Sequence, residues 1–170
     1  MKKSVRKESK FIVQTMNRKE GSKVQEPLLY HQLSVRTQQE LFEKLSTELE
    51  TQGIVQHSFL EALIEREAEF PTGLPLKIGV AIPHTDGTYV NEDRLVFATL
   101  ERPIPFNEMG GDEEDVIDVS VVIMLAIKEG KKHLSILQKL IESIQKEGFV
   151  EKLAQAEDTN KMKTIISAYL

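Results

Sequence analysis

A histidine that directly follows a proline is the residue of this chain best placed to do chemistry. His84 comes after the short apolar segment 79–82 and Pro83. The proline has a fixed φ and biases Ile82 toward an extended conformation, so His84 should leave the end of a strand with little freedom. A neutral imidazole nitrogen is nucleophilic near pH 7, which makes His84 a candidate phosphoryl acceptor. The alternative from spacing alone is a turn histidine without a chemical role.

Two further candidate residues lie on predicted helices. Arg66 lies just before the Phe-Pro-Thr-Gly turn, and its spacing alone favours an exposed pairing with a neighbouring glutamate. His133 follows Lys131 and Lys132 at the start of another predicted helix. Two lysines oppose the helix dipole there, which favours a bound anion; a solvated first turn is the alternative.

Composition excludes several classes of protein. A length of 170 residues with 40% hydrophobic and 29% charged residues predicts one domain. Cysteine is absent, which excludes disulfides, thiolate metal sites and cysteine nucleophiles. The sequence has no apolar run of about 18 residues and no signal-peptide core, so we expect a cytoplasmic protein.

Charge is unevenly distributed along the chain. Residues 1–25 contain eight Lys/Arg and two Glu, a net charge of +6. Because the whole chain has a net charge of −5, residues 26–170 carry −11. An acidic body argues against nucleic-acid binding. The sequence contains no Walker A motif and no G-x-S-x-G elbow. Its four histidines do not have metal-ligand spacing, so no cofactor and no metal site are expected.

Hydrophobic periodicity predicts helices, then strands, then helices. Capping boxes at Thr37 and Ser58 should open two helices, the first ending at Gly53 and the second near Glu69. The expected strands are 76–82, 94–100 and 116–127, and the later helices are 134–144, 149–156 and 162–169. This order predicts an α/β domain with a mixed sheet flanked by helices on both faces.

Two segments carry a family resemblance. The segment 66–74, Arg-Glu-Ala-Glu-Phe-Pro-Thr-Gly-Leu, and the segment 79–87 around His84 resemble the active-site region of type 2 (fructose/mannitol-type) enzyme IIA domains of the bacterial phosphotransferase system. The Phe-Pro-Thr-Gly-Leu part is most similar to the galactitol-specific branch. The resemblance covers about 30–170 and implies an enzyme IIA mannitol/fructose-type architecture over residues 27–170. Residues 1–26 are then a basic extension that we expect to be disordered.

The resemblance implies a phosphohistidine intermediate. HPr would donate a phosphoryl group to His84, which would pass it to a cysteine of the IIB component, while sugar crosses the membrane component IIC. Arg66 would stabilise the phosphoryl group, and His133 would be auxiliary, because galactitol-like members can carry glutamine there. The expected phosphate-binding residues are Thr72, Thr85 and Lys132. Asp86 would orient His84 or, with Gly87, form a plain turn.

A second function remains open at this point. Some enzyme IIA relatives report nutrient state by binding other proteins, so phosphorylation of His84 would control a partner contact through added negative charge. The sequence does not identify the sugar, and galactitol or a related sugar alcohol is the expectation from family likeness.

Overall fold

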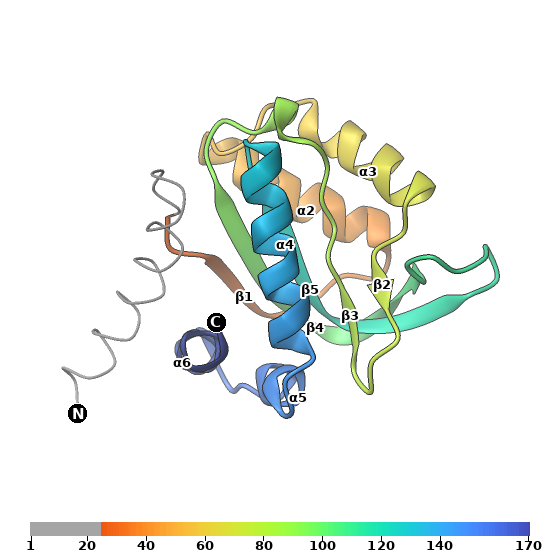
Figure 1. Cartoon of the computed structure of the whole chain (residues 1–170), viewed down its shortest axis with the longest axis vertical. Helices are drawn as coiled ribbons and strands as arrows, with labels where there is room; N and C mark the ends of the chain where they lie inside the picture. The colour runs from red at the N-terminus through yellow and green to blue at the C-terminus, as the bar shows by residue number, and fades with distance from the viewer. Residues whose placement is uncertain (1–24) are drawn as a thin grey trace.

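A five-stranded mixed sheet is the centre of the computed structural model, which describes residues 25–170 (Figure 1). The strand order is β1-β4-β5-β3-β2. The β1–β4 and β3–β5 pairs are parallel, whereas the β4–β5 and β2–β3 pairs are antiparallel. The strands are β1 Leu28–Leu33, β2 Gly73–Leu74, β3 Gly79–Ala81, β4 Arg94–Asn107 and β5 Val116–Ala126. The predicted extension 1–26, apart from its last two residues, lies outside the described part of the chain.

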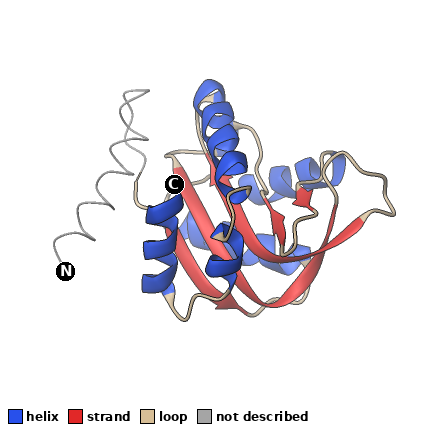
Figure 2. Cartoon of the chain, turned by 60° about the horizontal axis from the view of Figure 1, so that its bottom comes forward, coloured by secondary structure: helices blue, strands red, loops and turns tan. Residues whose placement is uncertain are grey.

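Helices cover both faces of this sheet (Figure 2). Helices α2 and α3 pack on one face; α4, α5 and α6 pack on the other (Figure 1). Their bounds are α2 Gln38–Thr51, α3 Phe59–Glu69, α4 Gly130–Ile144, α5 Phe149–Ala154 and α6 Thr159–Tyr169. Each face has its own buried apolar cluster. Because the central strands are buried on both faces, much of their sequence is continuously hydrophobic. The predicted α/β domain with helices on both faces is confirmed.

Local sequence signals account for some of the helix ends. The Thr37 side chain accepts a hydrogen bond from the Glu40 N–H, which caps α2, and Gly53 follows the helix with φ +75°. The predicted capping box at Ser58 is wrong in its details. Helix α3 does begin at Phe59, but the Ser58 side chain makes no capping hydrogen bond.

The strands differ more from the sequence-based expectation than the helices do. Strand β1 was not predicted, β3 is shorter than the expected strand 76–82, and β4 is longer than 94–100 because it continues past a bulge. Helix α4 starts at Gly130, which places His133 in its first turn, as expected. An apolar run alone does not reveal where pairing along a neighbouring strand begins and ends.

Close backbone contact fixes the segment that carries His84. A Cβ atom on Gly87 would lie 1.8 Å from the Lys128 carbonyl oxygen, so this position tolerates only glycine without movement. The Leu125 N–H donates to the Pro83 carbonyl, and His84 forms an isolated bridge with Leu125. Pairing with β5 therefore continues beyond β3 as far as the histidine. Across residues 25–170, no helix has both the length and the apolar character that crossing a membrane requires.

Candidate functional site

A cleft of about 330 Å³ lies where the segment after β3 meets α3 and α4. The residues that line it come from three parts of the sequence: Arg66, the segment 84–87, and Gly130, His133, Leu134 and Leu137. The structure therefore brings together His84, Arg66, His133 and Thr85, which the sequence analysis selected as candidates.

The orientation of His84 is set by its own backbone. Its Nδ1 lies 2.7 Å from the carbonyl oxygen of Ile82. A carbonyl oxygen only accepts, so Nδ1 carries the proton and the neutral ring has its lone pair on Nε2. The residue is 9% exposed but lines the cleft. Burial lowers the pKa of His84, the hydrogen bond to Ile82 opposes this, and the positive charge of Arg66 lowers it further.

His133 lies directly beside His84. The two ring centroids are 4.9 Å apart and the ring planes meet at 70°, an edge-to-face arrangement. Burial, followed by the charges of His84 and Arg66, lowers the pKa of His133 to about 4, while Asp86 opposes the shift. Both imidazoles are therefore neutral at pH 7, which is the form that attacks an electrophile.

Arg66 is held at the edge of the cleft by an aromatic ring. Its guanidinium carbon lies 4.3 Å from the centroid of the Phe70 ring, and Phe70 itself is 51% exposed. Stacking on one face of the guanidinium leaves its N–H donors free to bind an anion in the plane of the group. Phe70 was not predicted as a site residue, although its place in the Phe-Pro-Thr-Gly segment was a signal for it.

Thr85 and Asp86 follow His84 and also line the cleft. Thr85 is buried. The Asp86 carboxylate accepts a hydrogen bond from the Thr88 N–H and caps the 3-10 helix η1, Gly87–Tyr89. Hydrogen bonding by the Thr88 side chain, followed by its backbone N–H, lowers the pKa of Asp86. The plain turn expected from Asp86-Gly87 is thus present at the rim of the cleft.

Two predicted phosphate-binding residues do not line the cleft. The Thr72 hydroxyl and N–H both donate to the buried carboxylate of Glu67, at 2.9 to 3.0 Å. The Lys132 ammonium donates to Asp93 at 2.5 Å, and its side chain is 2% exposed. The polar groups of Thr72 and Lys132 therefore bind buried carboxylates. The partner of Thr72, Glu67, is next to Arg66 in the sequence, and Lys132 is next to His133. The sequence analysis recognised neither the Glu67–Thr72 contact nor the Asp93–Lys132 ion pair. For the ion pair, nothing near Lys132 in the chain indicates Asp93.

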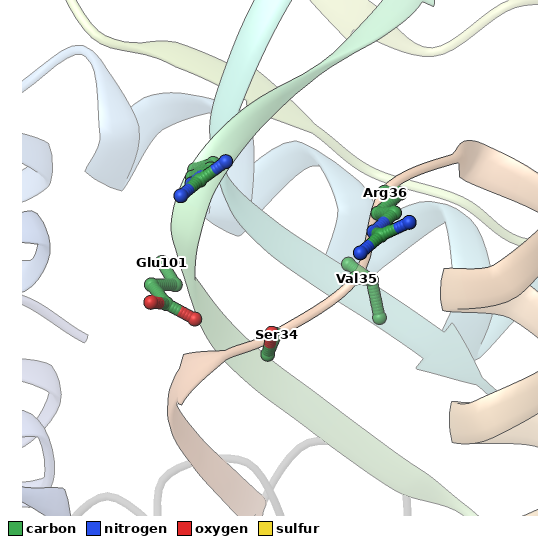
Figure 3. Close-up of a pocket in the computed structure, with 5 residues that line it drawn as sticks. Ser34, Val35, Arg36 and Glu101 are labelled. Carbon is green, nitrogen blue, oxygen red and sulfur yellow. The ribbon is translucent and has the colours of Figure 1, made fainter.

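A second hollow of about 160 Å³ lies between the end of β1 and the bulge of β4 (Figure 3). Ser34, Val35, Arg36, Glu101 and Arg102 line it. The polar side chains there are exposed, and none of the lining residues is a histidine. The cleft around His84 is the better candidate because it combines a buried nucleophile with a cation.

The geometry of the cleft suits group transfer to nitrogen. Two imidazoles and a guanidinium line the same cleft, and the two rings lie edge to face. Phosphoryl transfer needs alignment and positive charge around the moving oxygens more than covalent help, and Arg66 is a cation that lines this cleft.

Comparison with known proteins agrees with this chemistry. The family described as "Phosphoenolpyruvate-dependent sugar phosphotransferase system, EIIA 2" matches residues 24–169. The galactitol-specific EIIA component of Escherichia coli K12 is 28% identical over 132 residues, which are 77% of this chain and 86% of that protein.

Solved structures share the fold. The crystal structure of IIA mannitol from Escherichia coli has a TM-score of 0.67 at 21% identity and covers 81% of this chain and 94% of its own. The complex of IIA and phosphorylated IIB of the mannitol system from the same organism gives 0.71 at 19% identity, over 85% of this chain and 99% of that one. With the family match over most of its length, this chain belongs to the EIIA 2 family of the phosphoenolpyruvate-dependent sugar phosphotransferase system.

Proposed function

We propose that this EIIA component carries a phosphoryl group on Nε2 of His84. The observation that carries the proposal is the hydrogen bond from Nδ1 to the Ile82 carbonyl, because it leaves the lone pair of a neutral ring on Nε2. Arg66 and His133 border the same cleft and are the proposed phosphoryl-stabilising and auxiliary residues. Thr85 is a further proposed donor to the phosphoryl oxygens.

The proposed donor is the phosphohistidine of HPr. As the bond from phosphorus to Nε2 of His84 forms, the phosphorus–nitrogen bond of the donor breaks and its electron pair stays on the donor ring. Arg66 balances the charge on the phosphoryl oxygens during the transfer. In the second step a cysteine thiolate of a IIB component attacks the phosphorus, and the electron pair of the broken bond returns to Nε2 of His84.

The proposed sugar is galactitol or a related sugar alcohol. The support for it is the likeness to the galactitol-specific component, at 28% identity. Rates of transfer from the phosphorylated protein to purified IIB components of the galactitol, mannitol and fructose systems test this choice. Transfer to the galactitol IIB should be the fastest, and a faster transfer to either of the others would contradict it.

Labelling with phosphoenolpyruvate, enzyme I and HPr tests the phosphoryl carrier. An acid-labile, base-stable phosphate should form on the native chain and be absent from His84→Ala. His57→Ala is the matched control, because this histidine side chain is 94% exposed and does not line the cleft. Labelled His84→Ala would contradict the proposal, and labelling without passage to any IIB would favour the regulatory alternative.

Arg66→Ala should slow the labelling by about 100-fold, the usual effect of removing one donor from a charge-stabilising site. The folded structure should survive, because the guanidinium lies at the edge of the cleft against an exposed ring. A labelling rate within threefold of the native rate would remove Arg66 from the proposed site.

A further inference from the structure

A buried ion pair lies behind the cleft. Both carboxylate oxygens of Asp93 are used: Oδ1 accepts from the Lys128 N–H at 2.8 Å, and Oδ2 accepts from the Lys132 ammonium at 2.5 Å. The side chains of Asp93 and Lys132 are only 9% and 2% exposed. A charge as deeply buried as that of Lys132 requires compensation, so the position of the carboxylate restrains the lysine and the turn that carries it.

The pair acts directly on the helix turn that holds His133. Lys132 is the residue before His133 in the first turn of α4, and the His133 N–H donates to the Glu129 carbonyl. Glu129, the residue before α4, makes no side-chain capping hydrogen bond at this helix start. The Asp93–Lys132 pair and the Asp93–Lys128 hydrogen bond thus tie the first turn of α4 to the rest of the fold.

The same carboxylate also reaches the segment that holds His84. Asp93 fixes the backbone N–H of Lys128, and the carbonyl of Lys128 packs against Gly87, three residues after His84. One carboxylate therefore restrains both segments that present an imidazole to the cleft.

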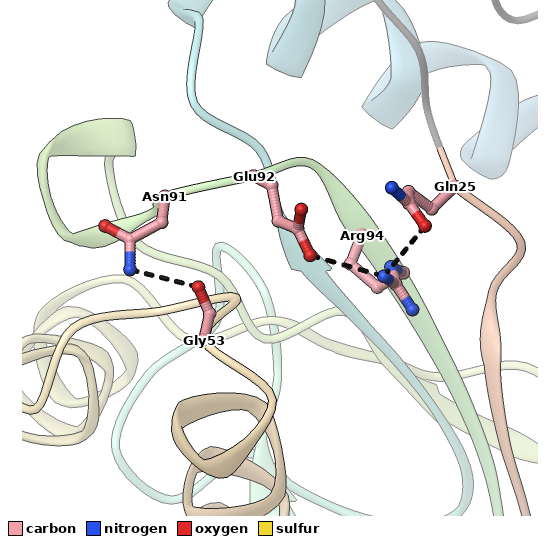
Figure 4. A network of polar contacts seen from close by, with 5 residues as sticks. All are labelled: Gln25, Gly53, Asn91, Glu92 and Arg94. Carbon is pink, nitrogen blue, oxygen red and sulfur yellow. Dashed lines mark hydrogen bonds and ion pairs between the residues drawn. The ribbon is translucent and has the colours of Figure 1, made fainter.

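Asp93 is itself held by its neighbours in the chain. Figure 4 shows the flanking contacts: the Asn91 side chain donates to the Gly53 carbonyl at 3.1 Å, and Arg94 contacts Gln25 and Glu92. The backbone N–H groups of Asn91 and Glu92 both point to the carbonyl of Ile54. The loop before β4 is therefore anchored to the end of α2, on the other side of the sheet from α4.

We propose that Asp93 is a positioning residue of the phosphoryl-transfer site, which sets the distance between His84 and His133 through Lys128 and Lys132. The inference rests on the proposed function for its effect on rate, but the geometric part concerns the two rings alone. Transfer depends on reacting atoms held within a fraction of an ångström, and a displacement of about 1 Å can lower a rate by about 100-fold.

The first variant to test is Asp93→Asn, which keeps the shape and removes the charge. Its kcat for phosphorylation by phospho-HPr should fall at least 10-fold with KM within about twofold, because the outer surface of the cleft is unchanged. His31→Ala is the control for lost stability: it removes a 2.7 Å hydrogen bond to the Ala156 carbonyl, far from the cleft, and should leave kcat unchanged.

The second variant separates positioning from folding. Asp93→Asn combined with Lys132→Met removes both buried charges, so resistance to denaturant should recover toward the native level. The kcat should stay at least 5-fold below native, because no tie replaces the ion pair. A double variant that is stable and transfers within twofold of the native rate would overturn the proposal.

A measurement without phosphate keeps the two proposals distinguishable. Nuclear Overhauser contacts between the His84 and His133 ring protons should be clear in the native chain and in His31→Ala, and weakened in both Asp93 variants. Unchanged contacts in the Asp93 variants would overturn the positioning role even if the protein were never phosphorylated. Failure of labelling in a native chain with normal ring contacts would overturn the proposed function alone.

Discussion

The two helices that border the cleft are anchored by different kinds of buried charge. On α3, Arg66 lines the cleft and the next residue, Glu67, is 3% exposed and bonded to Thr72, five residues away. On α4, His133 lines the cleft, and the residue before it, Lys132, is paired with Asp93, 39 residues away.

The difference separates a local anchor from a long-range one. Glu67 accepts hydrogen bonds from the N–H and the hydroxyl of Thr72, and within residues 25–170 it forms no salt bridge. Burial therefore raises its pKa, against the opposing hydrogen bonds from Thr72 and the charge of Arg66. The anchor of α4 is a charge pair that holds separate loops together. We expect changes on the α4 side to affect both stability and the spacing of the imidazoles, and changes on the α3 side to stay local.

The largest effect on stability should come from breaking the long-range anchor. Asp93→Asn leaves the Lys132 ammonium buried without its carboxylate, which should cost about 3 kcal/mol of unfolding free energy. Urea denaturation at pH 7 measures this cost. A loss below about 1 kcal/mol would mean that the two anchors differ less than their geometry indicates.

Gly87→Ala should have the next largest effect, because it forces apart the two loops that meet behind the cleft. The added Cβ would lie 1.8 Å from the Lys128 carbonyl, so the backbone must move, at a cost of about 2 kcal/mol. Gly130→Ala is the matched stability control, since a Cβ there meets nothing within 4 Å. Equal denaturation midpoints for the two variants would contradict the close contact.

Lowering the pH should change the stability contributions of His133 and Glu67 in opposite directions. The folded pKa of His133 is lowered to about 4, below its ordinary 6.5, so the unfolded chain binds more protons between these values. This contribution to stability is complete above pH 6.5 and is lost as the pH falls toward 4. His133→Gln should therefore flatten the loss of unfolding free energy between pH 6.5 and 4, measured by denaturation at a series of pH values. If unfolding free energy depended on pH in the same way in His133→Gln and in the native chain, the lowered pKa of His133 would be contradicted.

Glu67→Gln should have the smallest effect. The folded pKa of Glu67 is raised, so its contribution to stability is present below pH 4.5 and is lost as the pH rises through the folded pKa. At pH 7 the amide still accepts from Thr72, and the change should cost less than about 1 kcal/mol. Thr72→Val, which removes the hydroxyl donor, is the comparison and should cost more. A larger loss for Glu67→Gln than for Asp93→Asn would reverse the distinction between local and long-range anchors.

The same distinction explains what the sequence could predict. The arrangement of helices around a mixed sheet followed from runs of apolar residues. His84 and Arg66, which both line the cleft, were selected because each lies in a short contiguous pattern. Strand β1 was missed because its pairing partner, β4, is far along the chain. Lys132 was expected to bind phosphate because it lies at the start of a helix, and its ion pair was missed because Asp93 is equally remote in the chain. Contacts over a long separation become visible only once the chain is folded.

The hydrogen bond between His84 and Ile82 has a consequence for the product of the proposed reaction. Nδ1 keeps its proton when Nε2 is phosphorylated. When the phosphorus–nitrogen bond then breaks, the ring leaves as neutral imidazole and not as the much more basic imidazolate anion. A good leaving group makes the phosphorus–nitrogen bond easy to break when an acceptor attacks the phosphorus. One backbone carbonyl thereby keeps such a phosphoramidate labile enough to be handed on rather than stored.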